Sequence, residues 1–337
     1  MLWAAAGIFL SVVASVLPTV LYALALWWCD RYEREPFALL LAAFLWGAGP
    51  AVVLALIGES LLGVSPDAAS AGLAAELFST SALVPLVEES VKGLALVGLI
   101  FFFRHEFDGT LDGIVYGGLV GFGFAMTENF FYFAQAFLSA GPTQWVLVVI
   151  LRGIVFGLNH AFFTALFGAA VGYARHRGFR GHSPWVAVLG FVGAVLFHAA
   201  HNLGSTLTAV NPAALALSLA SGVGGVLLLA VVLLMALGRE REWISAELAQ
   251  EIGQSLSQEE YDYLTSSQRT AARLGWTRTA HAQWTHWMTE LAIKRAQARQ
   301  RGRDPAHDPR VQHARARLAA LRPAVAPPAK AEGGSGK

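Results

Sequence analysis

The stretch LVPLVEESVKGLALVGLIFFF, residues 83–103, combines an apolar run suited to a lipid bilayer with two adjacent carboxylates, Glu88 and Glu89, and an ammonium, Lys92. A charged residue at the centre of a membrane-spanning helix costs about 2.5–3.5 kcal/mol on insertion scales. Three such residues in one segment are therefore expensive, and ionisable groups inside a membrane generally mark a functional site. The stretch predicts a helix of a membrane bundle that carries part of a polar site.

The composition of the chain is that of a membrane protein followed by a more polar region. Of its 337 residues, 55% are hydrophobic and 14% are charged, whereas soluble domains carry about 25% charged residues. Residues 1–238 hold 8 Lys and Arg against 12 Asp and Glu, and residues 239–337 hold 16 against 11. We therefore predict an all-α protein with a transmembrane core over residues 1–238, a cytosolic helical region over 239–322 and a flexible tail over 323–337.

The net charge and the single cysteine narrow the functional classes. A net charge of +1 gives no reason to expect nucleic-acid binding. Cys29 alone excludes an internal disulfide and a cysteine metal cluster. The N-terminal apolar run lacks a positively charged start and is longer than the apolar part of a secretory signal peptide, so we expect a retained membrane span.

Seven apolar windows are long enough to cross a bilayer, which takes about 20 residues. They are residues 3–28, 37–62, 83–103, 112–138, 145–174, 185–209 and 213–238. The Lys and Arg residues between them fall in alternate connections, those near residues 31–34, 104 and 175–180. By the positive-inside rule, this pattern predicts that the N-terminus lies outside and the C-terminal region in the cytoplasm. We also expect Pro85 to interrupt the third segment.

Four ionisable residues on consecutive spans are predicted to lie at one depth. Counted from the charged residue or turn at the cytoplasmic end of each helix, they are 15 or 16 residues into their spans. They are Glu88, Glu128, His160 and His198. At a rise of about 1.5 Å per residue, all four lie about 22–24 Å from the cytoplasmic edge. Because packing alone requires no common level, we expect these side chains to converge on one hydrated site.

Further polar residues accompany this predicted site. The supporting residues and the amide that we assign to it are Lys92, Asn129, His201 and Asn202. Lys92 follows Glu88 by four residues, the better orientation for a helical ion pair. Glu59 and Arg152 project to about 34–35 Å, where we expect them to anchor the outer interface of the membrane.

The predicted site contains the groups that activation of a water molecule requires. A carboxylate can remove a proton from water as a general base, and a histidine or asparagine donor can stabilise an oxyanion. The same site could instead hold Zn²⁺, which would lower the pKa of its bound water. The ligands would then be Glu88, Glu128, His160 and His198. No serine or cysteine is comparably placed, so we expect hydrolysis without an acyl-enzyme.

Four ordered motifs resemble those of the PrsW family of bacterial intramembrane proteases. They are EESVK at residues 88–92, FAMTEN at 124–129, HAFFT at 160–164 and HAAHN at 198–202. The segment DRYEREP after the first span adds to the likeness, which covers residues 20–265. The PrsW family is similar to the CAAX prenyl endopeptidases and, more remotely, to the Aph-1 subunit of gamma-secretase.

The resemblance implies a multi-pass protease of the bacterial inner membrane. Its expected partners are the lipid bilayer and a single-pass membrane substrate, such as an anti-sigma factor, which it would cut first on the outer side. The implied roles are Glu88 as base, Glu89 as its partner, His160 for the water or the proton, and His198 with Asn202 for the oxyanion.

The resemblance leaves the role of Glu128 and the catalytic type open. The CAAX relatives have a histidine where this chain has Glu128, so this residue is either a second carboxylate of the reaction or a metal ligand. We favour a glutamic mechanism without a cofactor, and a Zn²⁺ enzyme is the alternative.

Two other classes of function remain open on the sequence. Buried Glu, His and Lys residues also build relays in proton- or ion-coupled transporters. A non-catalytic scaffold like Aph-1 is the second alternative.

Overall fold

The computed structural model of the protein describes residues 2–29, 35–64, 72–104, 106–253, 255–265, 278–300 and 302–325. These residues are almost entirely helical, and no β-strand occurs among them, so the predicted all-α fold is confirmed. The chain divides into two compact units. Unit 1 is Met1–Asp30 with Glu35–Ala236, and unit 2 is Arg31–Arg34 with Leu237–Lys337.

Unit 1 contains most of the helices. They are α1 (Leu2–Cys29), α2 (Phe37–Trp46), η1 (Gly47–Ala51), α3 (Val52–Leu61), α4 (Leu73–Phe78), η3 (Ser79–Leu83), α5 (Val84–Phe102), α6 (Thr110–Ala140), α7 (Pro142–Val148), η4 (Val149–Val155), α8 (Asn159–His176), α9 (Ser183–Leu207), η5 (Pro212–Ala214) and α10 (Leu215–Ala249), whose end belongs to unit 2. The segments η1, η3 and η4 are π-helical, and η5 is a 3₁₀ turn.

Six helical segments of the described chain are long and apolar enough to cross a membrane, by length and composition. They are Leu2–Cys29, Phe37–Leu61, Thr110–Ala140, Pro142–His176, Ser183–Leu207 and Pro212–Ala249. They coincide with six of the seven predicted windows, and the last one continues 11 residues beyond the predicted end at residue 238. The remaining window, residues 83–103, forms α5, an apolar helix that carries three charged residues. The protein is a multi-pass membrane protein.

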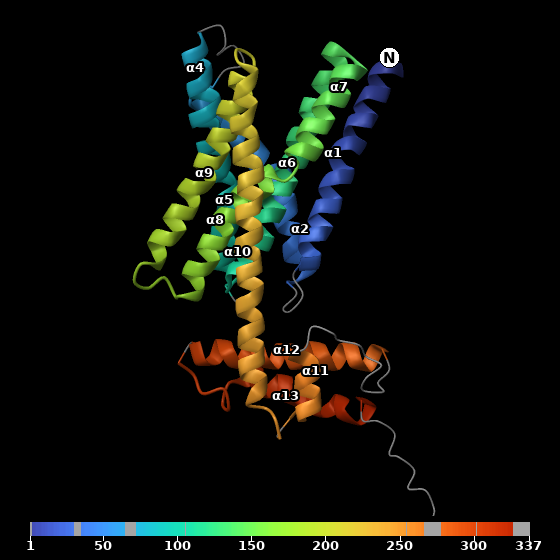
Figure 1. Ribbon diagram of the computed structural model, residues 1–337, viewed down its shortest axis with the longest axis vertical. Helices are drawn as coiled ribbons and strands as arrows, with labels where there is room; N and C mark the ends of the chain where they lie inside the picture. Colours follow the sequence, from blue (N-terminus) through green and yellow to red (C-terminus); the bar gives the residue numbers. More distant parts are fainter. Residues whose placement is uncertain are drawn as a thin grey trace, which may run out of the picture. The chain divides into compact units, whose positions relative to one another are not determined.

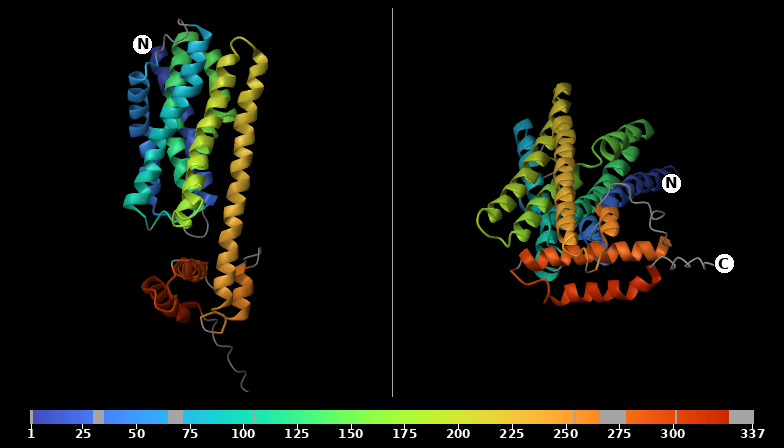
Figure 2. Two further views of the ribbon diagram at one scale, coloured as in Figure 1. Left: turned by 90° about the vertical axis from the view of Figure 1, so that its left-hand side faces the viewer. Right: turned by 60° about the horizontal axis from the view of Figure 1, so that its bottom comes forward.

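The helices α6 and α8 form the centre of unit 1, with α1 on one side of them and α9 on the other (Figures 1 and 2). The apolar stretch of α6 is 78% buried, against 17–33% for the other spans. Glycines allow this packing, because a Cβ on Gly113 would overlap the carbonyl oxygen of Gly168 and a Cβ on Gly168 that of Gly113. A Cβ on Gly121 would likewise overlap the carbonyl oxygen of His160. Small residues let helix backbones touch in this way, and here they bring His160 against α6.

A π-helical segment precedes Pro85, where the sequence predicts an interruption. The segment η3 ends at Leu83, and Pro85 lies in the first turn of α5. Proline cannot donate the helical hydrogen bond and crowds the preceding turn, and a wider π turn is one of the ways in which a helix accommodates such a position. The stretch from Leu73 to Phe102 is therefore helical throughout, with a change of geometry just before the charged residues.

Unit 2 is formed by the end of α10 with α11 (Gln258–Thr265), α12 (Arg278–Gln300) and α13 (Pro309–Val325). Its apolar core includes Trp284 and Met288, which are 2% and 0% exposed. Buried Arg295 pairs with Glu247, 3.1 Å away, and with Glu251. The predicted three-part division stays a prediction. Helix α13 ends at Val325, and residues 326–337 of the predicted tail lie outside the described residues. The segment DRYEREP partly does so as well, because residues 30–34 are not described.

A matched pair of glycine substitutions tests the packing of α6 on α8. We expect Gly168→Ala to destabilise the protein by about 1–3 kcal/mol, because the added methyl group has no space against Gly113. Gly98→Ala is the control, since a Cβ there meets nothing within 4 Å. Thermal unfolding in detergent is the measurement, and equal melting temperatures for the two variants would contradict this packing.

Candidate active site

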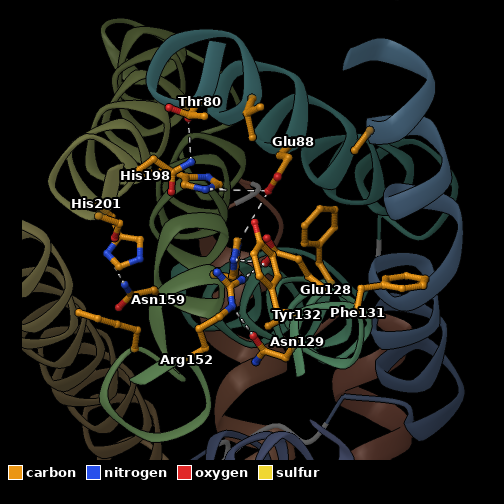
Figure 3. A pocket seen from close by; sticks show the side chains of 18 of the residues that line it. Thr80, Glu88, Glu128, Asn129, Phe131, Tyr132, Arg152, Asn159, His198 and His201 are labelled. Carbon is orange, nitrogen blue, oxygen red and sulfur yellow. Dashed lines mark hydrogen bonds and ion pairs between the residues drawn. The ribbon is translucent and has the colours of Figure 1, made fainter. Parts of the chain in front are cut away.

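A cavity of about 660 Å³ lies within unit 1 between α3, η3, α5, α6, η4, α8 and α9 (Figure 3). The four side chains predicted at a common depth all line this cavity, each from a different helix. They are Glu88 on α5, Glu128 on α6, His160 on α8 and His198 on α9. The structure therefore brings these residues together, and their roles in catalysis stay predictions.

Lys92 lies at the centre of the polar cluster. Its side chain is 0% exposed, and its Nζ atom is 2.9 Å from Oε2 of Glu88 and 2.9 Å from Oε1 of Glu89. The same atom is 3.0 Å from Nδ1 of His160. An ammonium group has three hydrogens, so these three contacts use all of them. The ring of Phe124 lies 3.8 Å from Nζ and adds a cation–π contact.

Glu89 is enclosed by donors and does not line the cavity. It accepts hydrogen bonds from Lys92 at 2.9 Å and from the hydroxyl of Thr164 at 3.1 Å. Its Oε1 atom is also 3.0 Å from Nδ1 of His198. The side chain is 1% exposed, against 7% for Glu88. Of the two adjacent carboxylates, only Glu88 faces the space that a reactant could enter.

The hydrogen-bond partners fix the tautomer of His198. An ionised carboxylate only accepts hydrogen bonds, so Nδ1 of His198 carries the hydrogen that faces Glu89. The Nε2 atom of His198 is then a lone-pair acceptor. It lies 3.9 Å from Oε2 of Glu88, too far for a direct hydrogen bond but within the span that one bridging water can cover.

His160 has both ring nitrogens engaged. Because the ammonium of Lys92 only donates, Nδ1 of His160 accepts and its hydrogen is on Nε2. That Nε2 atom lies 2.7 Å from Oε2 of Glu128. In this arrangement His160 lies between Lys92 and Glu128 and contacts each of them through one ring nitrogen.

Arg152 belongs to the cavity wall, a position that the sequence did not predict, and its expected location at the outer interface stays a prediction. Its Nη2 atom is 2.8 Å from Oε2 of Glu128, and its Nε atom donates to Oδ1 of Asn129 at 3.1 Å. Its guanidinium lies over the ring of Tyr132, 3.7 Å from the centroid (Figure 3). Oε2 of Glu128 is close to two nitrogens yet accepts no well-aligned hydrogen bond. Glu59, also expected as an anchor, lines the same cavity.

The chain around Arg152 is not the straight helix that residue counting assumed. The count from Arg175 assumed a constant rise through residues 152–175. In the structure α8 begins at Asn159, residues 156–158 form a turn, and Arg152 lies in the π-helical η4 before it. Irregular turns of this kind leave little trace in an apolar sequence.

The amides and His201 occupy the α9 side of the cavity. Asn202 donates to the carbonyl oxygen of Thr80 at 2.9 Å, which leaves one amide hydrogen for another acceptor. Nδ1 of His201 lies 3.2 Å from Nδ2 of Asn159 (Figure 3). The ring of His201 also packs against that of Phe156. Both His201 and Asn202 therefore lie beside the predicted site, where their backbone and amide contacts hold them in place.

Several site residues were missed in the sequence. They are Tyr132, Arg152, Asn159 and Thr164. Helical spacing could have identified two of them, because residues four apart share a face: Thr164 follows His160 by one turn, and Tyr132 follows Glu128.

A compact group of donors could hold a metal ion by distance alone. It consists of Glu88, Glu89, His160 and His198, with one ligand atom of each within 4.8 Å of the others. This set has Glu89 in the place of Glu128, which the sequence proposed as a ligand. The ammonium of Lys92 already contacts three of the four residues. A divalent ion bound to the same atoms would lie beside this positive charge, so the residues as arranged do not fit a metal ion.

Comparison with known proteins identifies the family. The model of the "PrsW family intramembrane metalloprotease" matches residues 35–237. The chain belongs to the PrsW family. Protease PrsW of Geobacillus kaustophilus is 34% identical over 147 residues, which are 43% of this chain and 58% of that protein. Protease PrsW of Clostridioides difficile is 30% identical over 149 residues, 44% of this chain and 59% of that protein.

The likeness to the PrsW relatives is partial in length. The matched region spans less than two thirds of each of the two relatives. No solved structure matches the chain. The family resemblance inferred from the four motifs is confirmed.

Replacing Lys92 tests whether its charge holds this PrsW-family site together. We expect Lys92→Met to cost about 3–5 kcal/mol of stability, because it leaves buried carboxylates without their cation. Arg104→Met is the control, since Arg104 is exposed outside the cluster. Both are measured by thermal unfolding in detergent, and a Lys92→Met protein as stable as the control would refute the ion cluster.

Proposed function

We propose that the protein is an intramembrane endopeptidase that hydrolyses a peptide bond in a single-pass membrane protein. The observation that carries this proposal is the juxtaposition of Glu88 and the lone pair of His198 on one cavity inside an apolar bundle. Membership of the PrsW family and two relatives named Protease PrsW support the reaction class. An anti-sigma-factor-like protein is the substrate class that we favour.

Glu88 acts as the general base in this proposal. A water molecule between Oε2 of Glu88 and Nε2 of His198 would be held by both acceptors, 3.9 Å apart. Glu88 takes one proton from this water as the water oxygen bonds to the substrate carbonyl carbon. The carbonyl oxygen becomes an oxyanion, and we assign its stabilisation to the second amide hydrogen of Asn202, which also lines the cavity. The C–N bond then breaks as the proton on Glu88 passes to the leaving amine.

Glu89, Lys92 and His160 position the reacting groups. Glu89 orients His198 and shares Lys92 with Glu88. Lys92 offsets the charge of the two carboxylates in a site with little access to solvent. His160, with both nitrogens engaged, supports Lys92 rather than holding the water.

We favour a glutamic catalytic type over a metal-dependent one. Three of the four residues that could hold a metal are bound to the ammonium of Lys92, and the proposed base and its proton transfer require no other cation. The description of the family as metalloproteases is the reason to test this point directly.

We further propose that the protein lies in the bacterial inner membrane with its N-terminus outside. The basic residues at positions 104 and 175–180 support a cytoplasmic location for that end of the bundle. The cavity lies at the opposite end of the helices, because α8 starts at it with Asn159 and His160 and α9 reaches it with His198 near its end. This placement favours a cut in the outer half of the membrane.

Two substitutions test the proposed reaction. We expect Glu88→Gln to lower kcat by about 10²–10⁴-fold, because it removes the general base, and His198→Ala to lower kcat as well. Glu76→Gln is the control, since Glu76 lies on α4 and does not line the cavity. The substrate is first captured by photo-crosslinking to the Glu88→Gln protein, and its cleavage is then measured with wild-type protein in proteoliposomes.

Two outcomes of this experiment would overturn the proposal. One is wild-type cleavage by folded Glu88→Gln protein. The other is the absence of cleavage by wild type together with an ion flux that Glu88→Gln abolishes, which would assign the cavity to a transporter.

Metal analysis tests the catalytic type. We expect purified protein to cleave the captured substrate equally well before and after treatment with a chelator, and to contain no stoichiometric zinc by mass spectrometry. The reason is that Lys92 occupies the cation position among the donors. Loss of cleavage in chelator with recovery on adding Zn²⁺ would establish a metalloenzyme instead.

A further inference from the structure

We propose that Arg152 is a positioning residue of this site, which holds Glu128 and, through Glu128, holds His160 in one tautomer and orientation. The kinetic part of this proposal rests on the proposed protease function, whereas its structural part does not. None of the sequence motifs contains Arg152, which lies between FAMTEN and HAFFT.

The first argument is that one carboxylate oxygen is shared. Oε2 of Glu128 is 2.8 Å from Nη2 of Arg152 and 2.7 Å from Nε2 of His160. The side chain of Glu128 therefore lies between the guanidinium and the imidazole. Because both neighbours contact this one oxygen, replacing Arg152 is expected to move the carboxylate of Glu128 and so change its contact with His160.

The second argument is that the guanidinium is itself fixed. Its Nε atom donates to Asn129 at 3.1 Å, and its plane lies over the ring of Tyr132. Both partners come from α6, the helix that also carries Glu128. Arg152 is thus attached to one face of α6 by three contacts, which a flexible interfacial anchor would not require.

The third argument is that the backbone around Arg152 is braced. Arg152 lies in η4, where the N–H of Phe156 bonds to the carbonyl of Leu151 at 2.8 Å in a π turn. The hydroxyl of Tyr22, from α1, donates to the carbonyl of Gly153 at 3.1 Å. Such π segments are frequent at functional sites, and this one turns the arginine toward the cavity.

The fourth argument is the balance of charge. The cluster has three carboxylates, Glu88, Glu89 and Glu128, and two cations, Lys92 and Arg152. With neutral histidines its net charge is −1, and loss of Arg152 would make it −2. The freed carboxylate of Glu128 would then compete for a proton or for the ammonium of Lys92, and His160 lies directly between them.

The contacts form one chain of side chains from the cavity wall to the proposed base. Its members in order are Arg152, Glu128, His160, Lys92 and Glu88. Arg152 touches none of the groups proposed to react, so its effect passes through the other members.

Nitrogen NMR of histidine-labelled protein in detergent tests the structural part. We expect His160, assigned by its loss in His160→Gln, to show the single Nε2–H tautomer in the wild type. In Arg152→Gln we expect a mixture of tautomers or a protonated ring, and in Arg152→Lys a smaller change. Arg175→Gln is the control, because Arg175 binds the carbonyl oxygens of Phe107 and Arg104 away from the cavity. An unchanged His160 signal in folded Arg152→Gln would overturn the proposal.

A double-substitution cycle tests the kinetic part. We expect Arg152→Gln to lower kcat about 10-fold or more through misplacement of the site, with KM changed less than about twofold. In a Glu128→Gln background, the same substitution should cost less than about twofold further, because coupled residues are not additive. If the two substitutions lower kcat independently, or if the loss is confined to KM, Arg152 acts directly on the substrate. Either result would refute its action through Glu128. If wild type cleaves no substrate, the proposed function fails while the tautomer experiment still decides the role of Arg152.

Discussion

The structure depends on the burial of one ammonium, that of Lys92, between two carboxylates inside an apolar bundle. Each of these charges would be costly alone in a membrane-spanning helix, and their mutual contacts at 2.9 Å offset that cost. The third contact, to His160, comes from α8. It is available because the glycine face of α6 lets α8 approach closely, at Gly113 and again at Gly121. Helix packing and the ion cluster are therefore two parts of the same arrangement.

Much of this arrangement follows from local rules that a sequence displays. Apolar length located six spans to within three residues at most of their ends. The rise of an α-helix grouped Glu88, Glu128, His160 and His198, which line one cavity. The same rule did not predict that Arg152 lines this cavity, and η4 and the turn at residues 156–158 interrupt the straight helix that the rule assumes. The π geometry depends on tertiary support, such as the bond from Tyr22 to Gly153, and no local pattern encodes it.

The resemblance implies different roles for Glu88 and Glu89 and leaves that of Glu128 open, and the three carboxylates differ in how far they are enclosed. Glu88 and Glu89 are adjacent, yet one faces the cavity and the other accepts hydrogen bonds from Lys92 and Thr164 in the interior. Glu128 faces the same cavity but is bound by Arg152. A base must be reachable by water and keep a lone pair for it. Of the three carboxylates, only Glu88 both lines the cavity and faces the lone-pair nitrogen of another residue, Nε2 of His198, which is 3.9 Å away.

Two cations, Lys92 and Arg152, hold the carboxylates of this site in place, whereas in a metal centre a single ion would do so. A metal ion holds carboxylates and imidazoles around one charge, and such a site forms only when the ion is bound. Here Lys92 and Arg152 are tethered to separate helices, α5 and η4, and each holds a different part of the site. The lysine sets the spacing of Glu88 and Glu89, and the arginine sets Glu128. His160 contacts Lys92 and also Glu128, which Arg152 holds. Its position therefore depends on both cations. A displacement of either Lys92 or Glu128 is therefore expected to change the orientation of this imidazole.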